Sequence, residues 1–262
     1  MDISLKGKRA IVCGGSQGIG LAIAKQFAEQ GAHITLISRD LQHLSEAVKQ
    51  LHTGKGQTHH TLNIDFGSPE EVRSVIKNYA QQNDDIQILV NNSGGPRAGK
   101  ILDIGTDEFK EAFLQHLVSD HILAKTLVPI MQKNGYGRII NILSVSVKEP
   151  IKGLGVSNAV RAAVANWAKT LANEVAEFGI TVNNILPGPT ETKRIEALIE
   201  DFSRRRKLPY DEIKTEMEQE IPLKRFAKAE EIANVVGFIA SPAASYINGI
   251  NLPVDGGKLG CL

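Results

Sequence analysis

The sequence is poor in cysteine and has no long apolar run. Its two cysteines, Cys13 and Cys261, lie near opposite ends of the 262 residues, which argues against a disulfide framework and a cysteine-based metal site. No stretch approaches the roughly 18 apolar residues of a membrane-spanning helix, and the first residues, MDISLKGKRAIVCGG, lack the apolar block of a signal peptide. The pair His59–His60 has no ligand partners at metal-binding spacing. We therefore expect a cytoplasmic protein with no membrane partner and no metal.

An excess of charge of either sign is also absent. The chain has 30 lysines and arginines against 29 aspartates and glutamates, a net charge of +1, so nucleic acid is not expected as a partner. One basic block, SRRRK at 203–207, could face an acidic carrier protein, but a solvated helix face is the simpler interpretation.

What the chain does contain is an alternation of short apolar runs and longer amphipathic segments. The runs predict strands at 9–14, 33–38, 59–65, 86–92, 138–145, 180–188 and 249–257. The amphipathic segments predict helices at 18–30, 40–52, 69–81, 107–132, 155–178 and 229–240. Strands that are apolar throughout indicate a sheet buried on both faces. The expected fold class is therefore α/β, with a doubly wound, mostly parallel Rossmann-type sheet of seven strands and helices on both faces.

The alternation is interrupted once, at residues 190–225. This segment is highly charged and lies between the last two expected strands. We expect this 190–225 excursion to be helical and to act as a lid over the substrate. No linker, repeat or low-complexity segment divides the chain elsewhere, so residues 1–262 are expected to form a single Rossmann-fold domain.

A glycine-rich turn follows the first expected strand and opens the first expected helix. Glycine lets the backbone turn sharply and approach a pyrophosphate, which the amino terminus of the helix attracts. The strand–turn–helix context favours a dinucleotide site over a purely structural turn. The residues expected to contact the cofactor here are Gly14, Ser16, Gln17, Gly18, Ile19 and Gly20.

Further motifs follow the glycine turn in a recognisable order. They are NNSGG at 91–95, GRIINILSVS at 137–146, ITVNNILPGPTET at 180–192 and VDGG at 254–257. With the Gly14-x-x-x-Gly18-x-Gly20 spacing, they make the chain resemble the short-chain dehydrogenase/reductase family over roughly residues 5–257, and most of all its bacterial 3-oxoacyl-acyl-carrier-protein reductases. The resemblance implies a nicotinamide-dependent oxidoreductase. It also implies a homotetramer, or a dimer, whose long helices pack between subunits.

The end of the second expected strand bears on the choice between NADP and NAD. An NAD enzyme usually presents an acid to the ribose hydroxyls at this point. This chain has Ser38 and Arg39 there, a hydroxyl and a guanidinium suited to a 2′-phosphate, so NADP(H) is favoured over NAD(H). Asp40 directly afterwards, and Gln17 in place of a basic residue often found in the family, count against this choice.

The resemblance implies further contacts with the cofactor. Asp65 matches a position that contacts the adenine amine, and Asn91 one that lines the adenosine pocket. From the residues alone, a turn cap and a hydrogen-bonding residue at a strand end explain Asp65 and Asn91 equally well. The positions implied around the nicotinamide are Pro187, Gly188, Thr190 and Thr192.

The catalytic positions are where the chain departs from the family. Family members donate a proton from a tyrosine that is made acidic by a lysine four residues later. A serine thirteen residues before the tyrosine bonds the carbonyl oxygen, and an asparagine on the preceding helix holds a water. Ser144 fits the serine position. In this chain Ser157 stands at the tyrosine position, Arg161 at the lysine position and His116 at the asparagine position.

Ser157 is not an acid equivalent to tyrosine. Tyrosine starts from a pKa of about 10, whereas an aliphatic hydroxyl lies closer to the roughly 15.7 of water, and each unit is worth about 1.4 kcal/mol. Arg161 can supply positive charge and hold ribose hydroxyls, but unlike lysine it does not release its proton at ordinary pH. The ordinary tyrosine mechanism is therefore not open to this chain.

Other side chains could supply the proton. His116 is expected to titrate near physiological pH, with a helix-surface histidine as the alternative. Lys148 and Lys152 lie in VKEPIKG, the loop that borders the substrate in the family, with solvated loop lysines as the alternative.

The tyrosines are less suitable as proton donors. Tyr210 and Lys214 have the Y-x-x-x-K spacing, but they fall in the 190–225 excursion, so we interpret the match as coincidence. Tyr136 precedes the fifth expected strand and should lie at the end of the sheet opposite to the ligands.

Two functions remain open at this point. The first is an atypical oxidoreductase that transfers a hydride between NADP(H) and a carbonyl or alcohol substrate, either a small molecule or an acyl thioester. Its catalytic residues would be Ser144, Ser157, Arg161 and His116. The second is a protein that keeps the dinucleotide fold, has lost catalysis, and acts as an NADP(H)-binding regulator or partner subunit.

Overall fold

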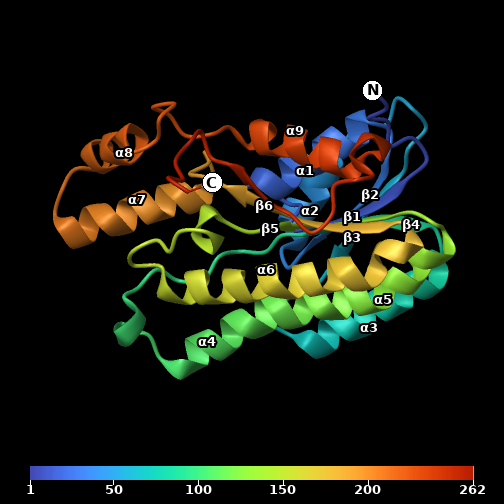
Figure 1. Cartoon of the computed structure of the whole chain (residues 1–262), viewed down its shortest axis with the longest axis horizontal. Coiled ribbons are helices and arrows are strands. Elements are labelled where there is room, and N and C mark those ends of the chain that lie inside the picture. The colour runs from blue at the N-terminus through green and yellow to red at the C-terminus, as the bar shows by residue number, and fades with distance from the viewer. Residues whose placement is uncertain (262) are drawn as a thin grey trace.

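Seven strands form one sheet in the computed structural model, which describes residues 1–261 (Figure 1). The strand order is β3-β2-β1-β4-β5-β6-β7, and each neighbouring pair is parallel. The α/β fold class with a doubly wound parallel sheet is therefore confirmed. The strands are β1 (Arg9–Cys13), β2 (His33–Ser38), β3 (His59–Asn63), β4 (Ile86–Asn91), β5 (Gly137–Ile142), β6 (Ile180–Pro187) and β7 (Asn251–Val254).

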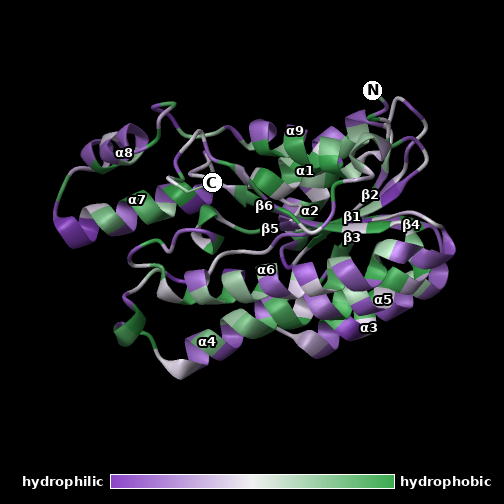
Figure 2. Ribbon diagram, in the orientation of Figure 1, coloured by the Kyte–Doolittle hydropathy of each residue, from purple (hydrophilic) through white to green (hydrophobic). Residues whose placement is uncertain are grey.

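Helices cover both faces of the sheet. Successive side chains of a strand point to opposite faces, so Ala10 and Val12 of β1 are buried in one core while Ile11 and Cys13 are buried in the other. Figure 2 shows the apolar strands in green between helices whose outer faces are purple. Within residues 1–261, no helix is both long and apolar enough to cross a membrane.

The helices divide between the two faces of the sheet. The core around Ala10 and Val12 includes residues of α1 (Gly18–Glu29), α2 (Leu41–Val48) and α9 (Ala229–Ala240). The core around Ile11 and Cys13 includes residues of α3 (Pro69–Gln82), α5 (Ser119–Lys133) and α6 (Gly155–Val175). The remaining elements are α4 (Thr106–Phe113), α7 (Lys193–Arg206), α8 (Tyr210–Gln219), the π-helical turn η2 (Leu114–Val118) and the 3-10 helices η1 (Ile101–Asp103), η3 (Val145–Val147), η4 (Ala176–Phe178) and η5 (Pro242–Ala244).

Some boundaries differ from the sequence-based expectation. The helix expected at 107–132 is interrupted, because η2 separates α4 from α5. The strand expected at 249–257 covers only Asn251–Val254, since Gly249 and Gly256 on either side have φ angles of +70° and +67°. The strand expected at 59–65 ends at Asn63, because Asp65 begins a turn in which its Oδ1 accepts a hydrogen bond from Gly67 N at 2.9 Å.

The strand order places a ligand crevice beside β1. Strand β1 is flanked by β2 on one side and by β4 on the other, so the chain order reverses between β1 and β4. In open α/β sheets ligands bind at the carboxyl ends of the strands at such a reversal. The glycine turn follows β1 at this point, and the loop of residues 92–100 follows β4.

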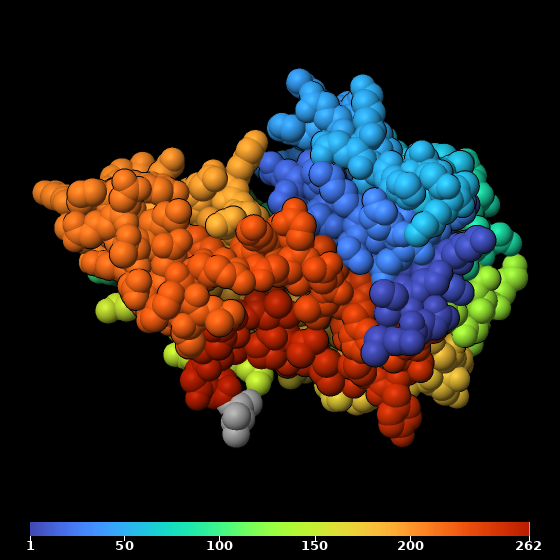
Figure 3. Space-filling view, turned by 90° about the horizontal axis from the view of Figure 1, so that it is seen from above, coloured from blue at the N-terminus to red at the C-terminus, as the bar shows by residue number. Residues whose placement is uncertain are grey.

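The 190–225 excursion contains α7 and α8. Backbone bonds close its base, from Glu191 N to Ala227 O and from Ala227 N to Pro189 O, both 2.9 Å long. The two helices share a small apolar core of their own that includes Ile199 and Ile213. In Figure 3 the excursion, in orange, projects from the body of the molecule. Its role as a substrate lid stays a prediction.

Candidate functional site

The glycine turn after β1 leaves no room for a side chain on Gly14 or Gly20. A Cβ on Gly14 would lie 2.6 Å from Asn92 O, and a Cβ on Gly20 would lie 2.1 Å from Gly14 O. Gly14 and Gly18 also have φ angles of +57° and +55°. Helix α1 begins here without a side-chain cap and without an acidic residue in its first turn. Its first N–H groups are therefore suited to a pyrophosphate.

The residues after β6 lie against the same turn. Thr192 precedes α7, and its Cγ2 would be 3.3 Å from a Cβ on Gly18. Thr192 Oγ1 donates to Thr190 O at 3.2 Å, and Thr190 Oγ1 donates to Gly188 O at 2.9 Å. These bonds fix the local conformation of the segment after Pro187. Thr192, which is predicted to lie near the nicotinamide, thus lies beside Gly18 of the turn that is predicted to hold the pyrophosphate.

The polar groups at the end of β2 are arranged around an exposed arginine. Ser16 Oγ and Ser38 Oγ are 3.1 Å apart, which ties the glycine turn to the strand end. Arg39 is exposed. The Asp40 carboxylate accepts from His43 N at 2.9 Å and lies 2.6 Å from His43 Nδ1, so it caps α2. The carboxylate that seemed to count against a 2′-phosphate is therefore held by its own helix.

The two residues expected near the adenosine have different environments. Asp65 is exposed, and the turn bond to Gly67 N uses only its Oδ1. Asn91, in contrast, is only 2% exposed, and its Nδ2 donates to Asn141 Oδ1 at 2.8 Å. The Nδ2 group of Asn91 is thus committed to the sheet, while its Oδ1 has no hydrogen-bond partner within residues 1–261, and its predicted role in lining the adenosine pocket stays a prediction.

Ser144 follows β5 and caps the amino end of the 3-10 helix η3. Its Oγ accepts a hydrogen bond from Ser146 N at 3.1 Å, and the side chain is half-buried. Because a backbone N–H can only donate, the Ser144 hydroxyl hydrogen is left to point elsewhere. The group is therefore able to donate a hydrogen bond to a carbonyl oxygen.

Ser157 and Arg161 lie one turn apart on α6, as expected. Arg161 Nε donates to Ser157 Oγ at 3.2 Å, and Arg161 Nη1 donates to Leu143 O at 2.8 Å and to Ile142 O at 3.1 Å. Burial lowers the pKa of Arg161 to about 10, with the charge of Arg194 acting in the same direction. The guanidinium therefore stays charged at neutral pH and docks against the two carbonyls that immediately precede Ser144.

His116 lies in the π-helical turn η2 and is buried, with 5% of its surface exposed. Its Nδ1 is 2.8 Å from Ser93 Oγ, whereas its Nε2 is buried without a hydrogen-bond partner among residues 1–261. Burial lowers its pKa to about 3, and the charge of Arg161 acts in the same direction. The expectation that His116 titrates near physiological pH is therefore wrong, and so is the alternative of a surface histidine.

This depressed pKa predicts that the stability of the protein depends on pH. The unfolded chain binds a proton at His116 below a pKa of roughly 6.5, whereas the folded chain does so only near 3, so stability falls as the pH falls between these values. The free energy of unfolding of the wild type should therefore fall from pH 6.5 to pH 4.5. In His116→Asn, which lacks the titrating group, we expect this fall to be smaller by about 2–3 kcal/mol. Urea titrations at both pH values measure this. The exposed His60→Asn variant is the control, and an unchanged pH dependence in His116→Asn would contradict the depressed pKa.

The other predicted proton donors lie in less suitable places. Lys152 is exposed and Lys148 is partly exposed. Tyr210 packs with the apolar core of α7 and α8 rather than on α6, which agrees with a coincidental match to the Y-x-x-x-K spacing. Tyr136 precedes β5 at the amino end of the sheet, where its hydroxyl donates to Ala240 O at 2.7 Å. None of these side chains forms one of the hydrogen bonds described above for Ser144, Ser157, Arg161 or His116.

Two charged residues near Arg161 were missed by the sequence reasoning. Asp120 is buried on α5, and burial raises its pKa well above the usual range even though Arg161 opposes the shift. Arg194 lies in the first turn of α7, and its Nη2 donates to Pro96 O at 2.7 Å. Neither residue belongs to a motif, so only the folded structure reveals that they act on Arg161.

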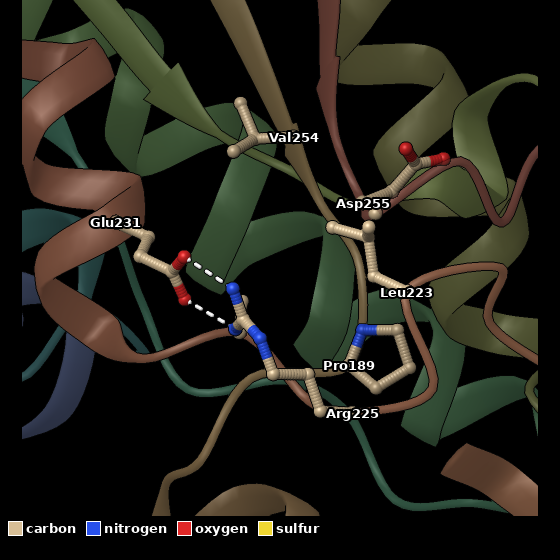
Figure 4. A pocket seen from close by; sticks show the side chains of 8 residues that line it. Pro189, Leu223, Arg225, Glu231, Val254 and Asp255 are labelled. Atoms are coloured by element: carbon tan, nitrogen blue, oxygen red, sulfur yellow. Dashed lines mark hydrogen bonds and ion pairs between the residues drawn. The ribbon is translucent and has the colours of Figure 1, made fainter.

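Two cavities lie away from the catalytic candidates. One of about 140 Å³ is found at the base of the 190–225 excursion, where Arg225 and Glu231 form two hydrogen bonds of 2.7 Å (Figure 4). The other, of about 660 Å³, includes Tyr136 and Gly179 at the amino end of the sheet. Within residues 1–261, no group of three or more His, Cys, Asp or Glu side chains could hold a metal ion.

Known proteins are similar to this chain in sequence and in fold. A family model described as enoyl-(acyl carrier protein) reductase matches residues 14–258. The 3-oxoacyl-[acyl-carrier-protein] reductase of Vibrio cholerae is 35% identical over 256 residues, which cover 97% of this chain and 98% of that protein. Dehydrogenase/reductase SDR family member 4 of Oryctolagus cuniculus is 32% identical over 97% of this chain and 94% of its own length. The crystal structure of L-sorbose reductase from Gluconobacter frateurii, complexed with NADPH and L-sorbose, has a TM-score of 0.93 at 33% identity and covers 100% of both chains.

Proposed function

Because the chain belongs to the short-chain dehydrogenase/reductase family of oxidoreductases, we propose that it transfers a hydride between NADP(H) and the carbonyl or alcohol group of its substrate. The substrate would be a small molecule or an acyl thioester, and the reaction would resemble that of 3-oxoacyl-acyl-carrier-protein reductases. The observation that carries this proposal is the docking of Arg161 on Leu143 O and Ile142 O, which brings Ser157 and a fixed cation to the end of β5, beside Ser144. We further propose a cytoplasmic homotetramer or dimer.

NADP(H) is proposed as the cofactor on three grounds. The glycine turn is closely packed, since a Cβ on Gly14 or Gly20 would meet backbone atoms, and this supports a pyrophosphate beside its N–H groups. The exposed Arg39 and the nearby Ser38 suit a 2′-phosphate, while Asp40 is committed to capping α2. The structurally similar L-sorbose reductase is complexed with NADPH. When bound, the nicotinamide would supply or accept the hydride.

Replacing Arg39 tests the cofactor preference. A hydrogen bond to a charged group is worth roughly 1.5–3 kcal/mol, so Arg39→Ala is expected to raise the Kd of NADPH by about 10- to 100-fold. The Kd of NADH should change little, since NADH lacks the 2′-phosphate. Fluorescence titration of both nucleotides measures the difference. Arg73→Ala, which removes an exposed arginine paired with Glu70 on α3, is the control. An unchanged affinity for NADPH would overturn the assignment of Arg39.

Each residue of the site would have its own role toward the substrate and the nicotinamide ribose. Ser144 would polarise the carbonyl through its free hydroxyl hydrogen, and Arg161 would stabilise negative charge on the same oxygen. His116 is neutral at physiological pH, so it would hold a water through its unpartnered Nε2 rather than act as the acid. This water would give a proton to the alkoxide that hydride transfer leaves on the carbonyl oxygen. The predicted contact between Arg161 and the nicotinamide ribose would depend on Nη2, because the other two nitrogens bond to protein atoms.

The lack of an acid at the tyrosine position favours a second candidate reaction, the reduction of a C=C bond conjugated to a carbonyl. In that case charge collects on an enolate oxygen, and a fixed cation such as Arg161 can stabilise an enolate without a proton donor at that oxygen. The proton is taken up at carbon, where water can supply it. The matching family model, described as enoyl-(acyl carrier protein) reductase, points in the same direction.

Oxidation of NADPH with a panel of 3-oxoacyl thioesters, small ketones and their conjugated C=C analogues tests the proposal. Turnover of ketones supports carbonyl reduction, and turnover of the unsaturated compounds alone supports the second reaction. NADPH binding at micromolar concentration without turnover of any compound would instead support a cofactor-binding regulator. If NADPH does not bind at all, both the enzyme and the regulator are ruled out.

A further inference from the structure

Two guanidinium groups lie beside Gly95, around the point where its side chain would begin. A Cβ built on Gly95 would lie 3.4 Å from both Nε and Nη2 of Arg194, and 3.5 Å from Nη2 of Arg161. The two arginines come from different parts of the chain, Arg161 from α6 and Arg194 from the start of the 190–225 excursion. Gly95 belongs to the loop after β4, and any side chain at this position would contact both guanidinium groups.

The nitrogens that face Gly95 are mostly uncommitted. Arg161 uses Nε for Ser157 and Nη1 for the carbonyls of Ile142 and Leu143, which leaves Nη2. Arg194 uses Nη2 for Pro96 O, which leaves Nε and Nη1. Each guanidinium is therefore fixed by the protein through some of its donors while the others remain for a ligand.

Neither of these two positive charges forms an ion pair within residues 1–261. Within residues 1–261, no carboxylate lies within 4.0 Å of a side-chain nitrogen of Arg161 or Arg194. Asp120 is the acid that acts on Arg161, and burial raises its pKa well above the usual range, which favours the neutral form. Burial also lowers the pKa of Arg194. Bringing like charges together is unfavourable unless an anion lies between them.

We infer that Arg161 and Arg194 together bind the carboxylate of an anionic substrate, and that the substrate is a short oxo acid or the corresponding hydroxy acid. Planar guanidinium groups pair with carboxylates through parallel N–H···O bonds, which gives both affinity and orientation. This inference rests on the proposed function, and it specifies the substrate class of the same site.

The length of the substrate follows from the place of Arg161. Its Nη1 bonds to Leu143 O, directly before Ser144, so a carboxylate held on Nη2 lies close to a carbonyl that Ser144 polarises. We therefore expect a 2-oxo or 3-oxo acid, in which the carboxylate and the carbonyl are close neighbours. Nη2 carries two N–H groups, so a carboxylate held by one of them leaves the other for the contacts proposed above.

Arg194 would also couple the substrate to the 190–225 excursion. It lies in the first turn of α7, and farther along the same helix Arg205 Nη2 donates to Ala98 O at 3.0 Å. A carboxylate between Arg161 and Arg194 would add a bond between the excursion and the sheet. Arg194 is thus a residue that positions the substrate and determines specificity.

The test compares 2-oxo and 3-oxo acids with their uncharged methyl esters, beginning with 3-oxobutanoate and methyl 3-oxobutanoate. We expect the wild type to prefer the acid in kcat/KM. Arg194→Gln should lower kcat/KM for the acid by at least about tenfold more than kcat/KM for the ester, mainly through KM. Arg194→Lys should recover part of the loss. Arg204→Gln is the control, because Arg204 is an exposed arginine on the same helix that pairs with Asp201 at 3.2 Å.

Binding of 3-hydroxybutanoate and 2-hydroxybutanoate to the protein with NADP, measured by calorimetry, separates this inference from the proposed function. Equal turnover of acids and esters would overturn the anion site and leave hydride transfer intact. Carboxylate binding that is lost in Arg194→Gln, without turnover of any compound, would uphold the anion site and overturn the proposed function. If no acid binds at millimolar concentration and none is preferred in turnover, the anion site is overturned.

Discussion

Ser144→Ala is expected to lower kcat/KM by about 10²- to 10³-fold, the usual cost of removing one hydrogen-bond donor to a developing oxyanion. The Ser144 Oγ accepts from Ser146 N, so its hydroxyl hydrogen is available for the carbonyl oxygen of the substrate. Because the interaction strengthens as charge develops on that oxygen, the loss should appear mainly in kcat. Steady-state kinetics with NADPH and the best substrate of the panel measures it.

Two further measurements make the Ser144 result specific. The Kd of NADPH should stay at the wild-type value, since the proposed role concerns the carbonyl and not the nucleotide. Ser146→Ala is the matched control, because Ser146 Oγ is buried without a hydrogen-bond partner among the described residues, and its removal should leave kcat unchanged. A loss of less than about threefold in Ser144→Ala would remove Ser144 from the catalytic set.

Gly20→Ala is expected to destabilise the protein by roughly 3 kcal/mol and to weaken nucleotide binding at least tenfold. The added Cβ would lie 2.1 Å from Gly14 O and 2.8 Å from Asn92 Nδ2. The first of these is a backbone atom, so the contact can only be relieved by moving the glycine turn away from α1. Such a movement would change the arrangement of the N–H groups that are proposed to hold the pyrophosphate.

Urea denaturation and NADPH titration measure the two effects of Gly20→Ala. Gly260→Ala is the control, because a Cβ at Gly260 would meet no atom within 4 Å. Wild-type stability together with wild-type NADPH affinity in Gly20→Ala would show that the turn adapts to a side chain. That outcome would contradict the close packing of α1 against β1.

The fold could be predicted from the sequence because its signals are local. Apolar runs of strand length alternate with amphipathic segments, and this alternation is sufficient to predict a parallel sheet covered on both faces. The glycine turn could also be predicted from the sequence. Gly14, Gly18 and Gly20 lie within one short segment, where positive φ angles and close backbone packing require glycine. The i to i+4 spacing also placed Ser157 and Arg161 together on α6, where they form a hydrogen bond.

The sequence could not determine how distant side chains affect each other. Asn91, Asn141, Asn184 and Asn251 form a chain of side-chain hydrogen bonds of 2.7–2.8 Å across β4, β5, β6 and β7, and only the register of the strands makes this chain possible. The amide nitrogen of Asn91 therefore belongs to a buried hydrogen-bond chain, and its predicted place in the adenosine pocket stays a prediction. The presence of the π-helical turn between α4 and α5 and the exact ends of β3 and β7 likewise depend on contacts outside the local sequence.

The sequence by itself determined the fold, the glycine turn and the absence of a tyrosine and a lysine at the catalytic positions. The tertiary structure alone decided the electrostatics of the site. Burial beside Arg161 lowers the pKa of His116 to about 3, and the meeting of α6 with the 190–225 excursion places Arg194 near Arg161. Desolvation and charge–charge interaction depend on distances in space, and residues 161 and 194 are brought together only by folding.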